Sequence, residues 1–202
     1  MKRATIVLFS IALIAAAAGC YRGYPPRIRL DRYGTIGLIQ FRSEAKGNIA
    51  EYATHIFLEV MLKSQPAARI KELGREDEVL RDIEANRLSP DALEALRRRF
   101  GVDTVIIGTL DVSNIRPRVD LATIISTLSV SADVDAIMTA RLLDTRDGTT
   151  IWTDSARDRR TVTQVSVMRG GGIFFDARDP ERAYGTLIRA LVMRTTRDFQ
   201  WR

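Results

Sequence analysis

Few side chains in this sequence have types and spacing suited to covalent chemistry. The 202 residues include one cysteine, Cys20, and one histidine, His55, which lies in a helical pattern without candidate ligand partners. Ser43 and many carboxylates are present, but no motif brings a nucleophile, a base and an orienting group together. The glycine-rich stretch 169–172 is not followed by the Lys-Ser or Lys-Thr of a phosphate-binding loop. The sequence therefore predicts a protein that is not an enzyme and that uses no cofactor, no metal and no small-molecule substrate.

Cys20 stands where an export signal would end. Lys2 and Arg3 supply positive charge ahead of an apolar run, residues 4–18, that is too short to span a bilayer. The sequence Ala17-Ala18-Gly19-Cys20 resembles the lipobox of bacterial lipoproteins, although that motif usually has leucine where Ala17 stands. The resemblance implies signal cleavage between Gly19 and Cys20, followed by lipid on the sulfur and on the new amino group. The alternative is an ordinary signal peptide with an incidental cysteine, which would leave an exported protein with one unpaired thiol.

Lipid on Cys20, with palmitate among its chains, would hold the protein on a membrane. Each buried CH2 group contributes about 0.8 kcal/mol, so two or three acyl chains give nearly permanent anchoring. Tyr21 follows the cysteine, whereas aspartate at that position is a familiar inner-membrane retention signal. We therefore expect a cell-envelope protein that is anchored in the outer membrane and faces the periplasm.

Composition and charge are typical of one globular domain behind a signal and a short tether. Hydrophobic residues make up 46% and charged residues 28% of the chain, and the net charge of +6 falls by two when Lys2 and Arg3 are removed. That excess suits an anionic lipid surface or cell-wall polymer and does not require nucleic acid. Residues 1–19 are predicted to be the signal peptide, residues 20–33, with Pro25-Pro26 and no periodicity, a lipidated tether, and residues 34–202 a single domain.

Hydrophobic periodicity predicts an α/β (α+β) fold in which a central mixed β-sheet is flanked by helices. Helix starts are marked by Asn48, which forms a capping-box pattern with Glu51, and by the pairs Ser89-Pro90 and Asp179-Pro180. The clearest strand is 128–142, where apolar and largely polar residues alternate with period two. The predicted elements are, in chain order, a strand at 35–41, a helix at 48–63, a strand at 68–73, a helix at 76–84, a helix from 89 to 100, a strand at 102–110, the strand at 128–142, a turn at 145–149, a returning strand from 151 to about 160, a loose stretch at 161–175 and a helix from 179.

Three local motifs resemble those of the CsgG/LpoB/TolB-N-like envelope lipoproteins. Residues 36–41 are similar to the opening strand of that family, residues 100–109 to its Gly-Ala-Asp segment, and residues 140–152 to its Arg-Leu…Trp hairpin. The resemblance covers most of residues 34–202 and implies a mixed sheet flanked by helices. It also implies a binding or assembly protein, and it carries no catalytic residues.

These features suggest two functions. The first is a non-enzymatic, lipid-anchored interaction module that docks on an envelope protein or on further copies of itself. The alternative is a CsgG-like channel subunit, in which strand 128–142 and its neighbour would enter the outer membrane. Such a channel needs a second hairpin, and the stretch left for it, 161–175, is short and interrupted by Arg169 and three glycines. The sequence therefore favours the interaction module.

Overall fold

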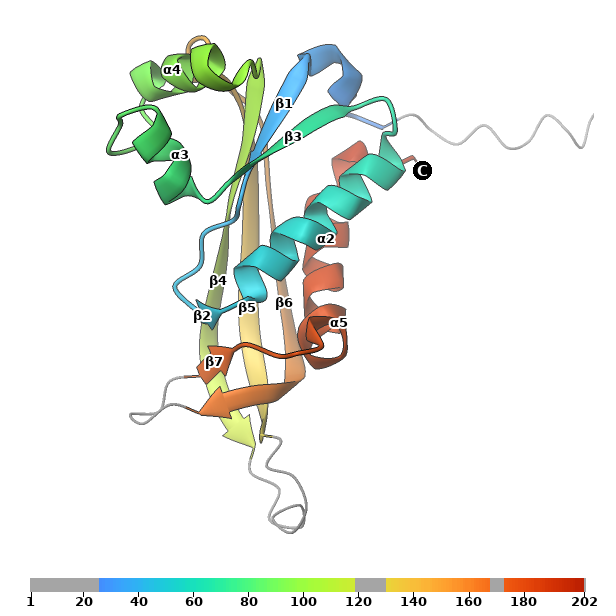
Figure 1. Cartoon of the computed structure of the whole chain (residues 1–202). Helices are drawn as coiled ribbons and strands as arrows, with labels where there is room; N and C mark the ends of the chain where they lie inside the picture. Colours follow the sequence, from blue (N-terminus) through green and yellow to red (C-terminus); the bar gives the residue numbers. More distant parts are fainter. Residues whose placement is uncertain (1–25, 119–129, 168–172, 202) are drawn as a thin grey trace, which may run out of the picture.

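The computed structural model describes residues 26–118, 130–167 and 173–201. In this part of the chain, seven strands form one curled mixed sheet in the order β2-β7-β6-β5-β4-β1-β3, and four α-helices pack on it (Figure 1). The predicted mixed sheet flanked by helices is therefore confirmed. The strands are β1 (Thr35–Ile39), β2 (Lys46–Gly47), β3 (Arg69–Gly74), β4 (Thr104–Arg118), β5 (Val130–Asp144), β6 (Thr150–Val167) and β7 (Ile173–Phe175), the helices are α2 (Ile49–Ser64), α3 (Glu76–Asp82), α4 (Pro90–Phe100) and α5 (Pro180–Thr195), and the 3-10 helices are η1 (Leu30–Tyr33) and η3 (Arg197–Phe199).

Strands β4, β5 and β6 form a long antiparallel unit, and β1 lies parallel to both β4 and β3. Every predicted strand is present, but β4 continues to Arg118 and β6 to Val167, well past the predicted ends. The prediction of a loose stretch at 161–175 is wrong at both ends, which belong to β6 and β7, while its glycines lie outside the described residues. Neither extension alternates cleanly in sequence, so only the backbone pairing with β5 and β7 reveals them.

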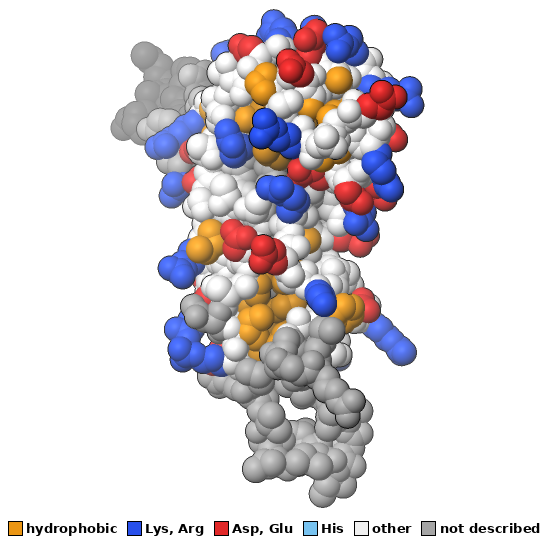
Figure 2. Space-filling view, turned by 90° about the vertical axis from the view of Figure 1, so that its left-hand side faces the viewer, with side chains coloured by type: hydrophobic (Ala, Val, Ile, Leu, Met, Phe, Trp, Pro, Cys, Tyr) orange, Lys and Arg blue, Asp and Glu red, His pale blue; other side chains and the backbone are white. Residues whose placement is uncertain are grey.

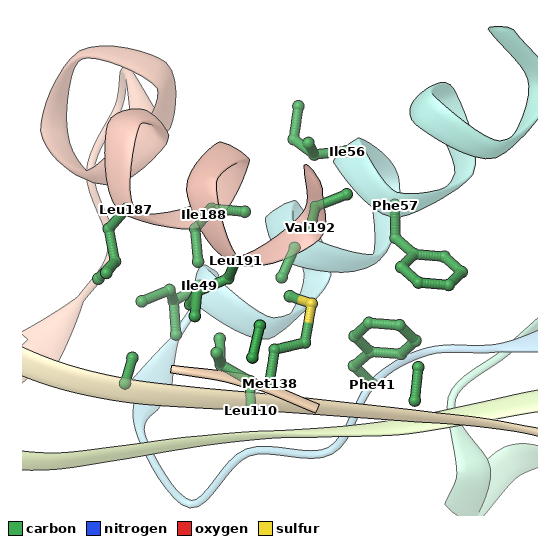
Figure 3. Packing of buried hydrophobic residues seen from close by; sticks show 14 of the residues in the cluster. Phe41, Ile49, Ile56, Phe57, Leu110, Met138, Leu187, Ile188, Leu191 and Val192 are labelled. Carbon is green, nitrogen blue, oxygen red and sulfur yellow. The ribbon is translucent and has the colours of Figure 1, made fainter. Parts of the chain in front are cut away.

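One face of the long strands is buried beneath α2 and α5. The side chains of Val134, Met138 and Leu142 are fully buried, which confirms the predicted alternation over residues 131–142, whereas residues 128 and 129 lie outside the described residues. Figure 3 shows Phe57 of α2 and Leu191 of α5 on the same side of the sheet as Met138. This main core therefore uses the apolar face of β5 for packing between sheet and helices.

The opposite face of the sheet is covered at one end only. Adjacent residues such as Leu142 and Leu143 fall into different core clusters, and Leu143 packs with Leu93 and Leu96 of α4 and Val79 of α3. Helix α4 begins and ends as its sequence predicts, since Ser89 Oγ accepts the Ala92 N–H at 3.3 Å and Gly101 adopts the left-handed conformation at φ 68°. None of the described helices is both long and apolar enough to cross a bilayer.

The two other predicted helix starts differ in outcome, because tertiary partners replace the local cap in one of them. Asp179 caps α5 as predicted, because its carboxylate accepts the Arg182 N–H at 3.1 Å. The capping box predicted for Asn48 does not form, since this side chain makes no capping hydrogen bond. Instead its Oδ1 accepts from the Tyr184 hydroxyl, and its Nδ2 donates to the Ala177 carbonyl at 3.3 Å. Asn48 thus ties the start of α2 to α5 and to the segment that leads into it.

The folded part begins earlier than the predicted boundary at residue 34. Pro26 and Leu30 are buried, and the Leu30 N–H donates to Gln65 Oε1 at 2.7 Å. Gln65 Nε2 donates in turn to the carbonyls of Ile28 at 2.6 Å and Phe199 at 3.0 Å. The predicted tether of residues 20–33 is therefore wrong for residues 26–33. The sequence could not show this, because the partners of this arginine-rich segment lie at the end of α2 and near the C-terminus.

Candidate functional site

The residues predicted for lipidation and signal cleavage, Cys20 and Gly19, lie outside the described residues. Their roles therefore stay predictions. The described chain starts with Pro26 at the end of the molecule where α2 and α5 both finish (Figure 1). Ile28 is held there by its N–H, which donates to the Asp198 carbonyl at 3.1 Å.

The structure does not bring Ser43 and His55 together as a nucleophile and base. Ser43 Oγ donates to the Leu110 carbonyl at 2.6 Å and accepts the Ala45 N–H at 3.2 Å, so it braces a loop. His55 is exposed on α2. It lines a cleft of about 260 Å³ together with Glu51 and other residues, and Ser43 does not line this cleft. Across the described ranges, no group of His, Cys, Asp and Glu side chains is arranged to hold a metal ion. The geometry of these side chains is thus that of structural and surface residues.

A cleft of about 810 Å³ lies where segment 40–47 crosses β4 below α3. Segment 40–47 is held to β4 by two backbone hydrogen bonds, from the Arg42 N–H to the Gly108 carbonyl at 2.9 Å and from the Leu110 N–H to the Arg42 carbonyl at 2.8 Å. A Cβ at position 108 would lie 2.7 Å from the ring of Phe41, so this close crossing requires glycine. The cleft is therefore fixed by the backbone of the sheet itself.

Charged side chains of both signs line this cleft. Arg42 Nε lies 3.3 Å from Glu76 Oε2, and Arg75 Nε lies 3.0 Å from Asp77 Oδ1, so two ion pairs sit on its α3 side. Asp111 of β4 is exposed on the opposite side. Figure 2, which shows the side of the molecule that carries α3 and β2 in Figure 1, has acidic and basic side chains interspersed over its upper part. Such a surface suits a partner that carries both charges.

A second cleft of about 300 Å³ adjoins the first and shares Arg42, Glu76 and Thr109 with it. It adds Arg87 beyond α3 and Arg141 of β5. Arg141 Nη2 already donates to Thr150 Oγ1 at 2.6 Å. The two clefts together form one groove over the outer face of the sheet, with the Arg42–Glu76 ion pair between its halves.

The groove borders an open strand edge. On the side of β4 away from β5, β1 pairs with residues 104–106 and Arg42 forms a bridge with Thr109. Within the described chain, no strand pairs with β4 beyond that point on this side. The N–H of Leu110 faces this side, so by strand alternation the N–H and carbonyl of Val112 face it too. An extended peptide that entered the cleft could therefore add to the sheet along β4.

Sequence reasoning missed this groove. The sequence predicts an ordinary polar loop at residues 42–47, between a strand and a helix. It predicts that Glu76 and Asp77 lie in the first turn of a short helix. The one available signal was the number of residues between the predicted strands at 102–110 and 128–142, which left room for an extension of β4. Which edge of that extension would stay open depends on the strand order, and a single sequence does not encode that locally.

No family model and no curated protein matches this chain. Similar solved structures include the PelC dodecamer from Paraburkholderia phytofirmans, with 14% identity and a TM-score of 0.48 over 89% of this chain and 94% of that one. Lipoprotein GNA1162 from Neisseria meningitidis has 16% identity and a TM-score of 0.39 over 63% and 83% of the two chains. The LpoB C-terminal domain from Salmonella enterica has 9% identity and a TM-score of 0.43 over 66% and 86%. Identities and TM-scores this low transfer no function to this chain.

Proposed function

We propose that this chain is a non-enzymatic, lipid-anchored envelope protein that docks an extended segment of another envelope protein in the groove beside β4. The observation that carries the proposal is the open edge of β4 next to a cleft of about 810 Å³ lined by both charges. Backbone hydrogen bonds to Val112 would supply affinity, and ion pairs with Arg75, Asp77 and Asp111 would select the partner. Lipid on Cys20 would keep this groove at the membrane, in the periplasm.

The arrangement of β5 favours this function over a channel subunit. The apolar face of β5 that would have to meet lipid, including Val134 and Met138, is already covered by α2 and α5. Its other face carries Asp135, which pairs with Arg159 at 3.1 Å, and Asp133, which accepts from Thr161 at 2.7 Å. A strand with one face buried and the other charged offers no face to hydrocarbon.

Site-specific photocrosslinking in intact cells tests the docking groove. A photoreactive amino acid at Asp111 should give a discrete adduct with one envelope protein, whereas the same group at Thr153, which is exposed on β6, should not. Replacing Val112 with proline removes the outward N–H and should reduce the Asp111 adduct several-fold while the fold persists by circular dichroism. Equal adducts at both positions, or an adduct unaffected by Val112→Pro, would show that the partner binds elsewhere.

A further inference from the structure

The exposed large hydrophobic side chains of the described chain gather at one end of the molecule. They are Leu62 near the end of α2, Met193 near the end of α5, and Trp201 near the C-terminus, with exposed fractions of 40%, 48% and 64%. Figure 1 shows the ends of both helices and the C-terminus close together. Elsewhere in the described chain, large hydrophobic side chains are buried or half-buried. Three exposed apolar side chains on elements that end close together mark this end as a candidate surface for contact with something apolar.

Hydrogen bonds hold this end together. Gln200 Nε2 donates to the Met193 carbonyl at 3.2 Å and to Thr196 Oγ1 at 2.9 Å, which fixes the residue before Trp201 against α5. Gln65, just past the end of α2, bonds to Ile28 and to Phe199. These hydrogen bonds fix the backbone on which the exposed hydrophobic side chains are carried. We call this end of the molecule, with Leu62, Met193 and Trp201, the platform.

Basic side chains surround this platform. The side chains of Lys63 and Arg27 are largely exposed, at 73% and 67%. Lys63 forms an ion pair with Glu59, and Arg27 forms one with Asp198. Arg197 is exposed on η3. Long cationic side chains beside an exposed tryptophan are the combination that favours the interface between lipid headgroups and acyl chains.

The number of residues between Cys20 and Pro26 limits how far this platform can lie from a membrane that holds the lipid of Cys20. Six residue steps separate Cys20 from Pro26, and a chain extends by at most about 3.5 Å per residue, so the two lie within about 20 Å of each other. Pro26 itself belongs to the platform end, because Ile28 and Arg27 contact Asp198 there. A lipid inserted at Cys20 would therefore hold this end of the molecule nearest to the membrane surface.

We propose that Leu62, Met193 and Trp201 form a membrane-contact surface that rests on the headgroups of the bilayer holding the lipid of Cys20. This proposal rests on the anchoring in the proposed function and adds an orientation to it. In this orientation the C-terminal ends of α2 and α5 would face the membrane, and the open edge of β4, which begins near the middle of that strand and continues towards the opposite end of the molecule, would face the periplasm (Figure 1). The docking groove is then presented to partners that approach from that side.

Spin labels on single introduced cysteines test the orientation. The lipidated full-length chain, in which lipid occupies Cys20, is reconstituted into vesicles of phosphatidylethanolamine and phosphatidylglycerol with a label at Met193→Cys, at Leu62→Cys, or at the control position Thr163→Cys. Thr163 is exposed near the far end of β6. We expect several-fold lower accessibility to a water-soluble nickel reagent and higher accessibility to oxygen at positions 193 and 62, and no such change at 163.

Flotation and fluorescence separate the possible failures. Vesicles that float with the protein while positions 193 and 163 stay equally accessible to nickel overturn the contact surface and leave the anchor standing. Protein that does not float refutes the anchor, and the contact surface with it. Trp201 gives an independent readout: its emission should shift to shorter wavelength in vesicles, and Trp201→Phe should abolish the shift because the remaining Trp152 is already buried.

Discussion

Gln65 joins three parts of the chain that are distant in sequence. Its side-chain amide accepts from Leu30 and donates to Ile28 and Phe199, and the residue itself is only 8% exposed. A buried amide that satisfies three backbone groups is costly to remove, since each group then loses its partner without gaining water. This one side chain therefore ties residues 28–30 to the end of α2 and to the C-terminal segment.

Replacing Gln65 with leucine should free the segment around Ile28. We expect a loss of about 1–3 kcal/mol in the free energy of unfolding, because buried backbone groups are left unsatisfied. Urea unfolding measures this loss, and limited trypsin digestion should then cut after Arg27 and Arg29 sooner than in the wild type. Lys63→Ala, on the exposed side of the last turn of α2, should stay within about 0.5 kcal/mol of the wild type. Equal protease resistance in both variants would mean that other contacts hold the segment.

A substitution at Val134 tests whether the apolar face of β5 packs in the core of the protein. The side chain is fully buried, so Val134→Asp would place a charge without a partner among hydrophobic residues. We expect more than about 3 kcal/mol of destabilisation, at the upper end of single substitutions. Thermal melts should show this as a large drop in Tm, whereas Thr163→Asp on the exposed side should change Tm little. An unchanged Tm for Val134→Asp would instead indicate that this face is free to meet lipid or another subunit.

At the scale of elements, helices α2 and α5 are joined by a polar cluster at their starts. The Tyr52 hydroxyl donates to Glu181 Oε2, and Arg189 makes two hydrogen bonds to the same carboxylate, at 2.9 and 3.0 Å. The Arg189 guanidinium, and then the Tyr52 hydroxyl, hold the pKa of Glu181 below its ordinary value. Tyr184, which packs edge-to-face on Tyr52 with ring centroids 5.6 Å apart, has its pKa raised by burial.

The lowered pKa of Glu181 predicts a pH dependence for this cluster, in which Arg189 of the same helix contributes most and Tyr52 adds the link to α2. Because the folded pKa lies below the unfolded value of about 4.3, the contribution is complete above that pH and is lost as pH falls through the folded pKa. Wild type should therefore exceed Glu181→Gln in stability at pH 7, and the difference should shrink towards zero below pH 4 in urea unfolding. Glu94→Gln, whose ion pair with Arg98 lies within one helix, serves as the control. A difference that is constant with pH would contradict the coupling.

The elements that the sequence predicted well are those whose signals are local. Ser89, Gly101 and Asp179 act through neighbours a few residues away, and the alternation along β5 needs only one covered face. The failures depend on distant partners: Asn48 bonds to Tyr184 instead of capping, and Leu30 bonds to Gln65. The groove beside β4 belongs to the same class, since an open strand edge is a property of strand order. Sequence patterns report periodicity and caps, and they do not report which edges stay unpaired.

At the scale of the whole molecule, the packing of residues 26–33 on the domain leaves fewer residues between Cys20 and the folded part. A tether of residues 20–33 would let the domain move some 40 Å from the membrane, whereas the segment ahead of Pro26 allows about 20 Å. With lipid on Cys20, a segment of that length would keep the domain close to its own bilayer, and the proposed contact surface would then favour one orientation. Partners would then reach the groove from the periplasmic side, and cross-linked products should be confined to proteins that come within that distance.

Both the proposed docking function and the proposed orientation depend on lipid at Cys20. Cys20→Ala removes the thiol that would carry lipid, so the protein should take up no labelled palmitate and should be recovered as a soluble periplasmic form or with its signal still attached. Palmitate labelling, carbonate-washed membrane fractions and the intact mass of the N-terminus measure this. Trp201→Phe is the matched control, since it alters the proposed contact surface and leaves the lipid; it should stay labelled and membrane-bound, because acyl chains dominate the binding at about 0.8 kcal/mol per CH2. The anchor is refuted if the wild type never incorporates palmitate and Cys20→Ala still resists the carbonate wash, and the membrane attachment would then have to come from the folded domain.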